Sequence, residues 1–216
     1  MIFTRTANAG GLLTLGDTTI LLDGVCNLVE PYSPTPDAMR AQLLAQLPDV
    51  VAFTHVHPDH FDGAFSQAYH AATHRPIYGP VNLPFAVPAA QAVNAGSFSL
   101  TSVITRHLGK PGQGGHVSFL LEGSRRIWFM GDAAPPTWKT DETGSILFAP
   151  FAYANTPLSW RKVCQAGFKT VVLLHMPEPE KDPYGLWDSV RAVTTDTTGI
   201  DIYIPQMGET LEIPIV

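Results

Sequence analysis

One short segment of the chain gathers most of the groups that could do chemistry. It reads Thr54-His55-Val56-His57-Pro58-Asp59-His60 and places three imidazoles and a carboxylate within six residues. These are ligand types that zinc accepts in catalytic sites, where one coordination position stays open for water. The chain has eight histidines among 216 residues, so three rarely fall this close by chance. The segment therefore predicts a metal site rather than a polar surface loop.

The spacing within this segment indicates two metal ions. In an extended loop, alternate residues point to the same side, so His55 and His57 can bind one ion together. Pro58 then bends the chain, which allows Asp59 and His60 to reach a second ion a few ångströms away.

The elements before the segment must hold it in place. Residues 37–47 have the apolar periodicity of an amphipathic helix of about three turns, with Asp37 placed to cap it and Pro48 to end it. Residues 49–54 form an apolar run that predicts a buried strand leading into His55. The histidine cluster is therefore expected on the loop at the carboxyl end of a strand.

The rest of the chain alternates predicted strands and helices. Gly16-Asp17 joins two apolar runs as in a hairpin. Further helices are predicted at 64–73, 83–93 (despite Pro84 and Pro88), 158–167 and 188–196. Strands are predicted at 2–4, 11–15, 18–23, 76–79, 97–105, 117–121, 126–130, 145–149, 170–174, 200–205 and 210–215.

Further candidate ligands follow later strands. Asp132 comes directly after Gly131 at the end of the strand predicted at 126–130, and His175 follows the one at 170–174. His107 and His116 lie in or beside a Gly-rich loop between them. The residues alone do not select among these.

The segment His55-Val56-His57-Pro58-Asp59-His60 resembles the HxHxDH signature of the metallo-β-lactamase superfamily. The order of the later Gly-Asp pair and the final histidine also fits, so the resemblance spans residues 22–175. It implies an α/β fold, a four-layer αββα sandwich with a dinuclear site at one edge of its sheets. By this resemblance, one ion is held by His55, His57 and a later histidine, the other by Asp59, His60 and His175, with Asp132 bridging both.

His107 is the favoured later histidine, because it follows a strand and begins a loop, as the ligand does in the lactonase-like and phosphodiesterase-like branches. His116 is the alternative, and it would need Gly114-Gly115 to bend it inward; otherwise it faces the substrate or the surface. Ala133 replaces the threonine that commonly follows the Gly-Asp pair, which leaves ligation intact but removes a hydroxyl.

Asp23 closes a buried apolar run, where a carboxylate is costly unless it is paired. It is either the acceptor for the second N–H of a ligating histidine or a turn residue before Gly24. The sequence leaves both interpretations open.

Two divalent ions, zinc first with manganese or iron as alternatives, can share a water and lower its pKa. We expect a metal-dependent hydrolase that uses the resulting bridging hydroxide on an ester, lactone or phosphodiester of a small molecule, with Asp59 orienting the hydroxide or moving its proton. The alternative is a metal-binding sensor or an iron-dependent redox protein. Candidate substrate contacts are Tyr32, Lys110, His116, Trp138 and Tyr184.

Composition and charge bear on the number of domains, the partners and the location of the protein. With 45% hydrophobic and 15% charged residues, the chain is expected to fold as one domain over 1–216. A net charge of −6 argues against nucleic acid as a partner. No run of about 20 apolar residues suggests a membrane span and no leader pattern opens the chain, so a cytoplasmic location is expected. Cys26 and Cys164 form no disulfide or thiolate-metal spacing, and the sequence sets no expectation for oligomeric state.

Overall fold

The computed structural model describes residues 1–80, 86–88, 93–110 and 115–214, and its strands form two sheets. The first sheet has the order β14-β1-β2-β3-β4-β5-β6. Its pairs are antiparallel from β14 to β3 and parallel from β3 to β6. The strands are β1 (Ile2–Arg5), β2 (Gly11–Leu15), β3 (Thr18–Leu22), β4 (Val50–Ala52), β5 (Ile77–Gly79), β6 (Ala86–Pro88) and β14 (Thr210–Glu212).

The second sheet has the order β13-β12-β11-β10-β9-β8-β7. It is antiparallel from β7 to β10 and parallel from β10 to β13. The strands are β7 (Val93–Ala95), β8 (Phe98–Ile104), β9 (Val117–Glu122), β10 (Arg126–Phe129), β11 (Ile146–Pro150), β12 (Thr170–Leu174) and β13 (Asp201–Tyr203).

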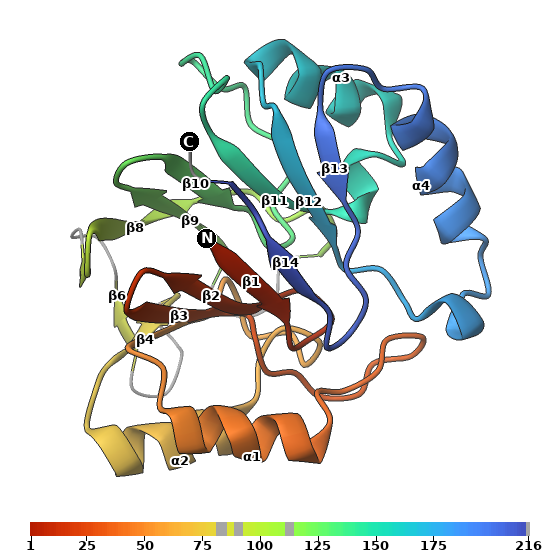
Figure 1. The fold of residues 1–216 in the computed structure, drawn as a ribbon. Coiled ribbons are helices and arrows are strands. Elements are labelled where there is room, and N and C mark those ends of the chain that lie inside the picture. Colours follow the sequence, from red (N-terminus) through yellow and green to blue (C-terminus); the bar gives the residue numbers. More distant parts are fainter. Residues whose placement is uncertain (81–85, 89–92, 111–114, 215–216) are drawn as a thin grey trace.

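The sheets face each other across a shared core, and helices cover their outer faces. In β2, buried and half-buried residues alternate, because one face of the strand turns to this core. Helices α1 (Asp37–Gln46) and α2 (Gly63–Thr73) lie against the first sheet, and α3 (Pro157–Ala166) and α4 (Leu186–Thr195) against the second (Figure 1). Short 3₁₀ helices occur at η1 (Phe151–Tyr153) and η2 (Pro179–Lys181).

Three clusters of buried side chains confirm the four layers. The cluster between the sheets includes Leu13, Phe119 and Phe148. The outer clusters fill the space under the two helix pairs, one around Leu43 and the other around Trp160. Strands β11 and β12 are buried along their whole length, as expected of parallel strands covered on both faces. The predicted αββα sandwich is therefore correct.

Two local predictions were wrong. The residue before α1 is Pro36 and no side chain caps the helix, so Asp37 lies in the first turn, where its charge favours the helix dipole. The helix predicted at 83–93 lies partly outside the described residues. Within them, Ala86–Pro88 forms strand β6 and Val93 begins β7. A proline inside a helix removes a backbone hydrogen bond and destabilises it, whereas an edge strand such as β6 tolerates a proline at position 88.

The strand ends determine where candidate ligands lie. His55 follows β4, His107 follows β8, Asp132 follows β10 and His175 follows β12. The last two strands belong to the parallel part of the second sheet, so their carboxyl ends share one edge. Among the described residues, no helix has the length and hydropathy of a membrane-spanning segment.

Candidate metal centre

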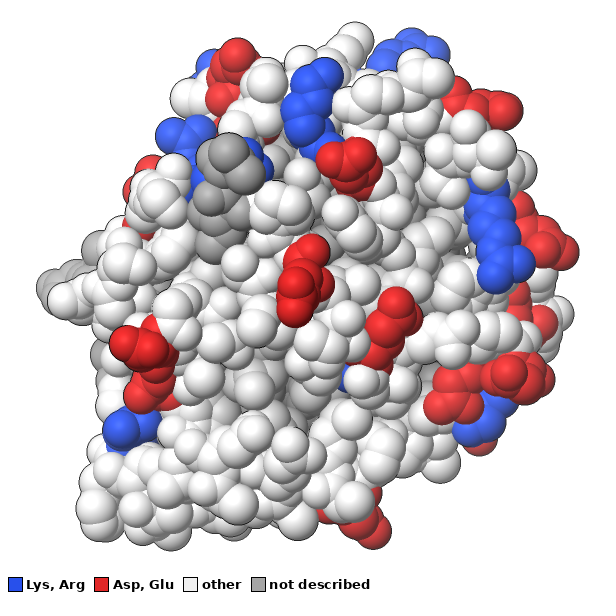
Figure 2. All heavy atoms as spheres, in the orientation of Figure 1, with Lys and Arg blue, Asp and Glu red and all other residues white. Residues whose placement is uncertain are grey.

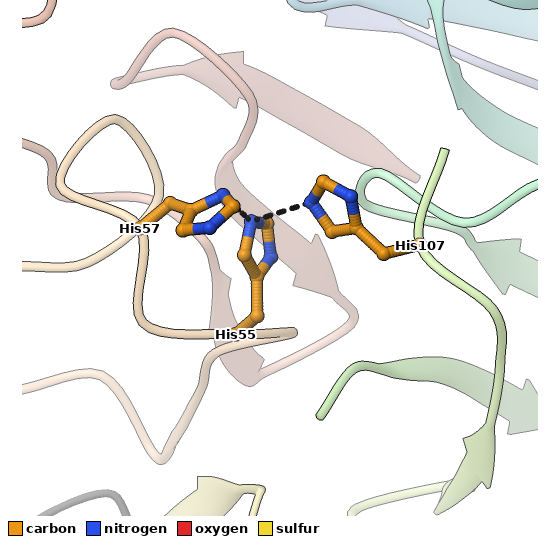
Figure 3. Close-up of side chains that lie close together, drawn as sticks. All are labelled: His55, His57 and His107. Carbon is orange, nitrogen blue, oxygen red and sulfur yellow. Dashed lines mark hydrogen bonds between the residues drawn. The ribbon is translucent and has the colours of Figure 1, made fainter. Parts of the chain in front are cut away.

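Three histidines from two separate loops converge into a first group. His55 and His57 come from the loop after β4, and His107 comes from the loop after β8. His55 Nε2 lies 3.0 Å from His57 Nδ1 and 3.3 Å from His107 Nε2. Figure 3 shows the His57 and His107 rings turned toward His55 from opposite sides.

These separations fit a shared ion. Two nitrogens bound to one tetrahedral zinc at about 2.0–2.1 Å lie roughly 3.3 Å apart. His107 Nδ1 accepts the Gly109 N–H at 2.9 Å, a state in which Nε2 carries the ring proton. Ligation through His107 Nε2 therefore requires the proton to move to Nδ1 and this contact to open.

A second group joins Asp59, His60 and His175. His175 Nε2 lies 3.0 Å from Asp59 Oδ2. Within the described part of the chain, His60 Nε2 and both ring nitrogens of His175 are buried without a hydrogen bond, because the nearby Asp59 and Asp132 oxygens do not meet them with hydrogen-bond geometry. Buried polar atoms normally have partners, so these nitrogens are suited to receive a metal ion.

Asp132 lies between the two groups. Its Oδ2 atom is 3.6 Å from His107 Nε2 in the first group, and 3.4 Å and 3.6 Å from His60 Nε2 and His175 Nε2 in the second. Burial raises the pKa of Asp132, but the charges of His175 and His60 outweigh it and hold that pKa well below its usual range. An ionised carboxylate in this position is suited to bridge two cations.

Asp23 orients one histidine in each group. It is fully buried, and its Oδ2 accepts from His60 Nδ1 at 2.8 Å and from the Thr54 hydroxyl at 2.5 Å. Because Thr54 gives its only hydroxyl proton to Asp23, its oxygen accepts from His55 Nδ1 at 3.0 Å. Both rings thus have Nδ1 held by Thr54 or Asp23 and direct Nε2 toward the two ligand groups.

The structure therefore favours the interpretation of Asp23 as an acceptor for ligand histidines. Thr54, which completes the network, was missed by the sequence analysis, although it directly precedes the first histidine. The Thr54 N–H also donates to Asp23 Oδ1 at 2.6 Å.

His116 was considered as an alternative metal ligand or as a residue facing the substrate or the surface, and the structure favours neither. It is buried, and both of its ring nitrogens already have protein partners. Nδ1 donates to Thr105 Oγ1 at 2.8 Å, because the Thr105 hydroxyl donates to Ser118 and Ser118 donates to the Met130 carbonyl. Nε2 accepts the Asp132 N–H at 3.1 Å. Burial, reinforced by His107, lowers the pKa of His116 to about 3, so it stays neutral and holds the Asp132 backbone.

The geometry consequently favours His107 over His116 as the third histidine. The loop at His107 pairs with the segment after Asp132, since Leu108 N–H donates to the Asp132 carbonyl and His107 forms a β-bridge with Ala133.

Two of the four described non-glycine residues with a positive φ lie at this centre. Asp23 and His175 have φ values of 44° and 65°, a region that non-glycine residues adopt at a cost of order 1–3 kcal/mol. Gly131 has a φ of 54°, and a Cβ on it would lie 2.4 Å from Thr54 Oγ1. Glycine at position 131 therefore leaves room for the Thr54–Asp23 network.

The candidate substrate contacts separate into different locations. Tyr32 packs edge-to-face on His175 with ring centroids 4.5 Å apart, and burial, with the charges of Asp132 and Asp59, raises its pKa to about 12. Its phenol therefore remains a proton donor beside the second group. Trp138 instead packs against Phe168 in the core on the helix-covered side of the second sheet. Lys110 and Tyr184 are exposed.

Comparison with known proteins supports the fold. The sequence matches no protein-family model and no curated protein. Among solved structures, the metallo-β-lactamase fold protein YhfI from Bacillus subtilis is 18% identical with a TM-score of 0.65, and each chain is covered to 98%. A possible metal-dependent hydrolase from Veillonella parvula is 15% identical with a TM-score of 0.69 and 99% coverage of both chains. CmlA, a diiron β-hydroxylase from Streptomyces venezuelae, is 15% identical with a TM-score of 0.59, over 98% of this chain and 54% of CmlA. The chain thus has the metallo-β-lactamase fold.

Proposed function

We propose that this protein is a hydrolase of the metallo-β-lactamase superfamily that uses two divalent metal ions to cleave an ester, lactone or phosphodiester of a small molecule. One observation carries the proposal: the two ligand groups converge on a single carboxylate oxygen of Asp132. His55, His57 and His107 would hold one ion, and Asp59, His60 and His175 the other. The mixture of imidazole and carboxylate donors favours zinc, with manganese or iron as alternatives.

When bound, two such ions lower the pKa of a shared water and polarise the carbonyl or phosphoryl oxygen of the substrate. The chain's own residues supply the remaining functions. Asp59 is buried, and its Oδ2 lies 3.0 Å from His175 Nε2. We assign Asp59 to orienting the attacking water and accepting its proton, and the Tyr32 hydroxyl to donating a hydrogen bond to the substrate.

A second candidate function is an iron-dependent redox reaction or metal-dependent sensing. The likeness to CmlA, described as a diiron β-hydroxylase, favours the redox form of this alternative. The identity of the bound metal and an assay for oxidation separate it from hydrolysis.

The proposed substrate is a small molecule, and the proposed location is the cytoplasm. On the face that Figure 2 shows, Lys and Arg are scattered among acidic and uncharged residues and form no continuous basic stripe. Together with the net charge of −6, this face offers little attraction to a phosphate backbone.

The test is a hydrolysis assay on the zinc-loaded protein with p-nitrophenyl acetate, γ-butyrolactone and bis-p-nitrophenyl phosphate. We expect turnover of at least one, reduced a hundredfold or more in Asp132→Asn. It should be retained in His70→Ala, which changes a half-buried histidine in the last turn of α2 that belongs to neither ligand group. Hydrolysis that survives in Asp132→Asn, or no hydrolysis by protein that carries two ions, would contradict the proposal.

A further inference from the structure

A cavity of about 180 Å³ lies beside the metal centre. The predicted metal ligands, all of which the structure describes, are not among its lining residues. Its walls include Arg5, Asn8, Ser33, Met176 and Trp187. An engineered cavity of about 150 Å³ accommodates benzene, so there is room for a small organic molecule.

Arg5 brings a buried positive charge to this cavity. It is 3% exposed, and its guanidinium donates to the carbonyls of Ala7, Asn8, Met176 and Pro205. These bonds occupy four of its five N–H groups. Within the described part of the chain, no carboxylate forms an ion pair with it, and the charges of Glu178 and Glu209 act on it only from farther away. Burial lowers the pKa of Arg5 to about 10, so it remains charged at neutral pH.

Asn8 adds an amide without a partner. Its side chain is buried at 1% exposure, and neither Oδ1 nor Nδ2 has a hydrogen bond within the described residues. Leaving a buried polar group unsatisfied costs about 1–3 kcal/mol. Both amide atoms are enclosed, so a ligand meets them only after the side chain turns toward the cavity, a movement that breaks no hydrogen bond.

The remaining lining is partly apolar and partly acidic. Met176 and Trp187 supply apolar surface, and the Trp187 indole is fixed by donation to the Pro177 carbonyl. Glu178 and Glu180 also line the cavity, but Lys181 Nζ lies 3.0 Å from a Glu178 oxygen and compensates its charge.

We infer that this cavity binds a small carboxylate that carries a hydroxyl or amino group on the adjacent carbon, such as a 2-hydroxy acid. The carboxylate accepts from the remaining Arg5 N–H and from Asn8 Nδ2, and the adjacent group donates to Asn8 Oδ1. The ligand thereby supplies the direct ion pair that Arg5 lacks and the missing amide partners. Because the Asn8 carbonyl also accepts the His175 N–H at 3.0 Å, the occupied cavity adjoins the second ligand group.

The test is a calorimetric titration of the full-length, metal-loaded protein with lactate at constant ionic strength. Asn8→Ala removes the amide and keeps the backbone carbonyl that Arg5 and His175 use. We expect saturable binding that weakens at least tenfold in Asn8→Ala, while the folded state is no less stable because an unsatisfied amide is gone. Asn8→Asp has nearly the same size, and its negative charge should repel lactate.

Two controls separate this site from the metals. His57→Ala should lower the metal content and leave lactate binding unchanged, whereas the Asn8 variants should leave the metal content unchanged. Lactamide, which lacks the carboxylate, should bind at least tenfold more weakly than lactate. Absent lactate binding, wild-type lactate affinity in both Asn8 variants, or binding that disappears with the metal in His57→Ala would overturn the inference.

Discussion

Replacing Asp23 by Asn keeps the side-chain size but removes half of its accepting capacity. The carboxylate accepts three hydrogen bonds, from the Thr54 N–H, the Thr54 hydroxyl and His60 Nδ1. With the amide nitrogen at the Oδ1 position, two donors face each other at Thr54. With it at the Oδ2 position, His60 Nδ1 must become an acceptor, which places the ring proton on Nε2, the atom proposed to bind metal.

The expected loss can be estimated from this contact. Removing a partner of a ligating histidine typically weakens metal affinity by about 10–100-fold, or roughly 1.4–2.7 kcal/mol. His60 belongs to the second group, and His55, connected through Thr54, belongs to the first. We therefore expect Asp23→Asn to weaken the binding of both ions, more strongly in the second group.

The assay is a competition titration against a chromophoric chelator. Asp49→Asn is a matched control, because Asp49 accepts from the N–H and hydroxyl of Thr19 at 2.9 Å and 3.0 Å but lies exposed. It should leave metal affinity unchanged. Wild-type affinity for both ions in Asp23→Asn would refute the reasoning.

Three further predictions concern stability. Gly131→Ala should unfold at a lower denaturant concentration than Gly16→Ala, since both glycines have positive φ but only the former meets Thr54. Chemical denaturation compares them, and equal losses would contradict the steric argument. His116→Ala should lose about 1–3 kcal/mol by orphaning the Asp132 N–H, yet keep two metal equivalents by elemental analysis. Chelation should lower the melting temperature, because free metal at 1,000 times Kd stabilises by about 4 kcal/mol per site; an unchanged melting curve would count against bound metal.

The fold and the convergence of ligands were predictable because their signals are local. An apolar run that ends in a histidine identifies both β4 with His55 and β12 with His175. In each case, the histidine follows the carboxyl end of its strand, and the parallel strands of that sheet bring their carboxyl ends to one edge. Predicting the four-layer architecture also required the resemblance to the metallo-β-lactamase superfamily.

Other features depend on contacts between distant segments. The role of Asp23 is set by Thr54 and His60, more than 30 residues away. His107 and His116 differ in whether Thr105 and the Asp132 backbone occupy their nitrogens, which spacing does not reveal. Strand β6 forms because β5 pairs with it, and the helix-like composition of 83–93 carries no sign of that partner.

The most direct test of the dinuclear centre is the metal content of the purified protein, measured by elemental analysis in the wild type, His107→Ala, His175→Ala and Asp132→Ala. We predict about two equivalents of a divalent metal in the wild type, about one in each histidine variant because each removes a ligand from a different group, and the lowest content in Asp132→Ala. Wild-type protein without metal, or three variants that retain two equivalents, would contradict the account.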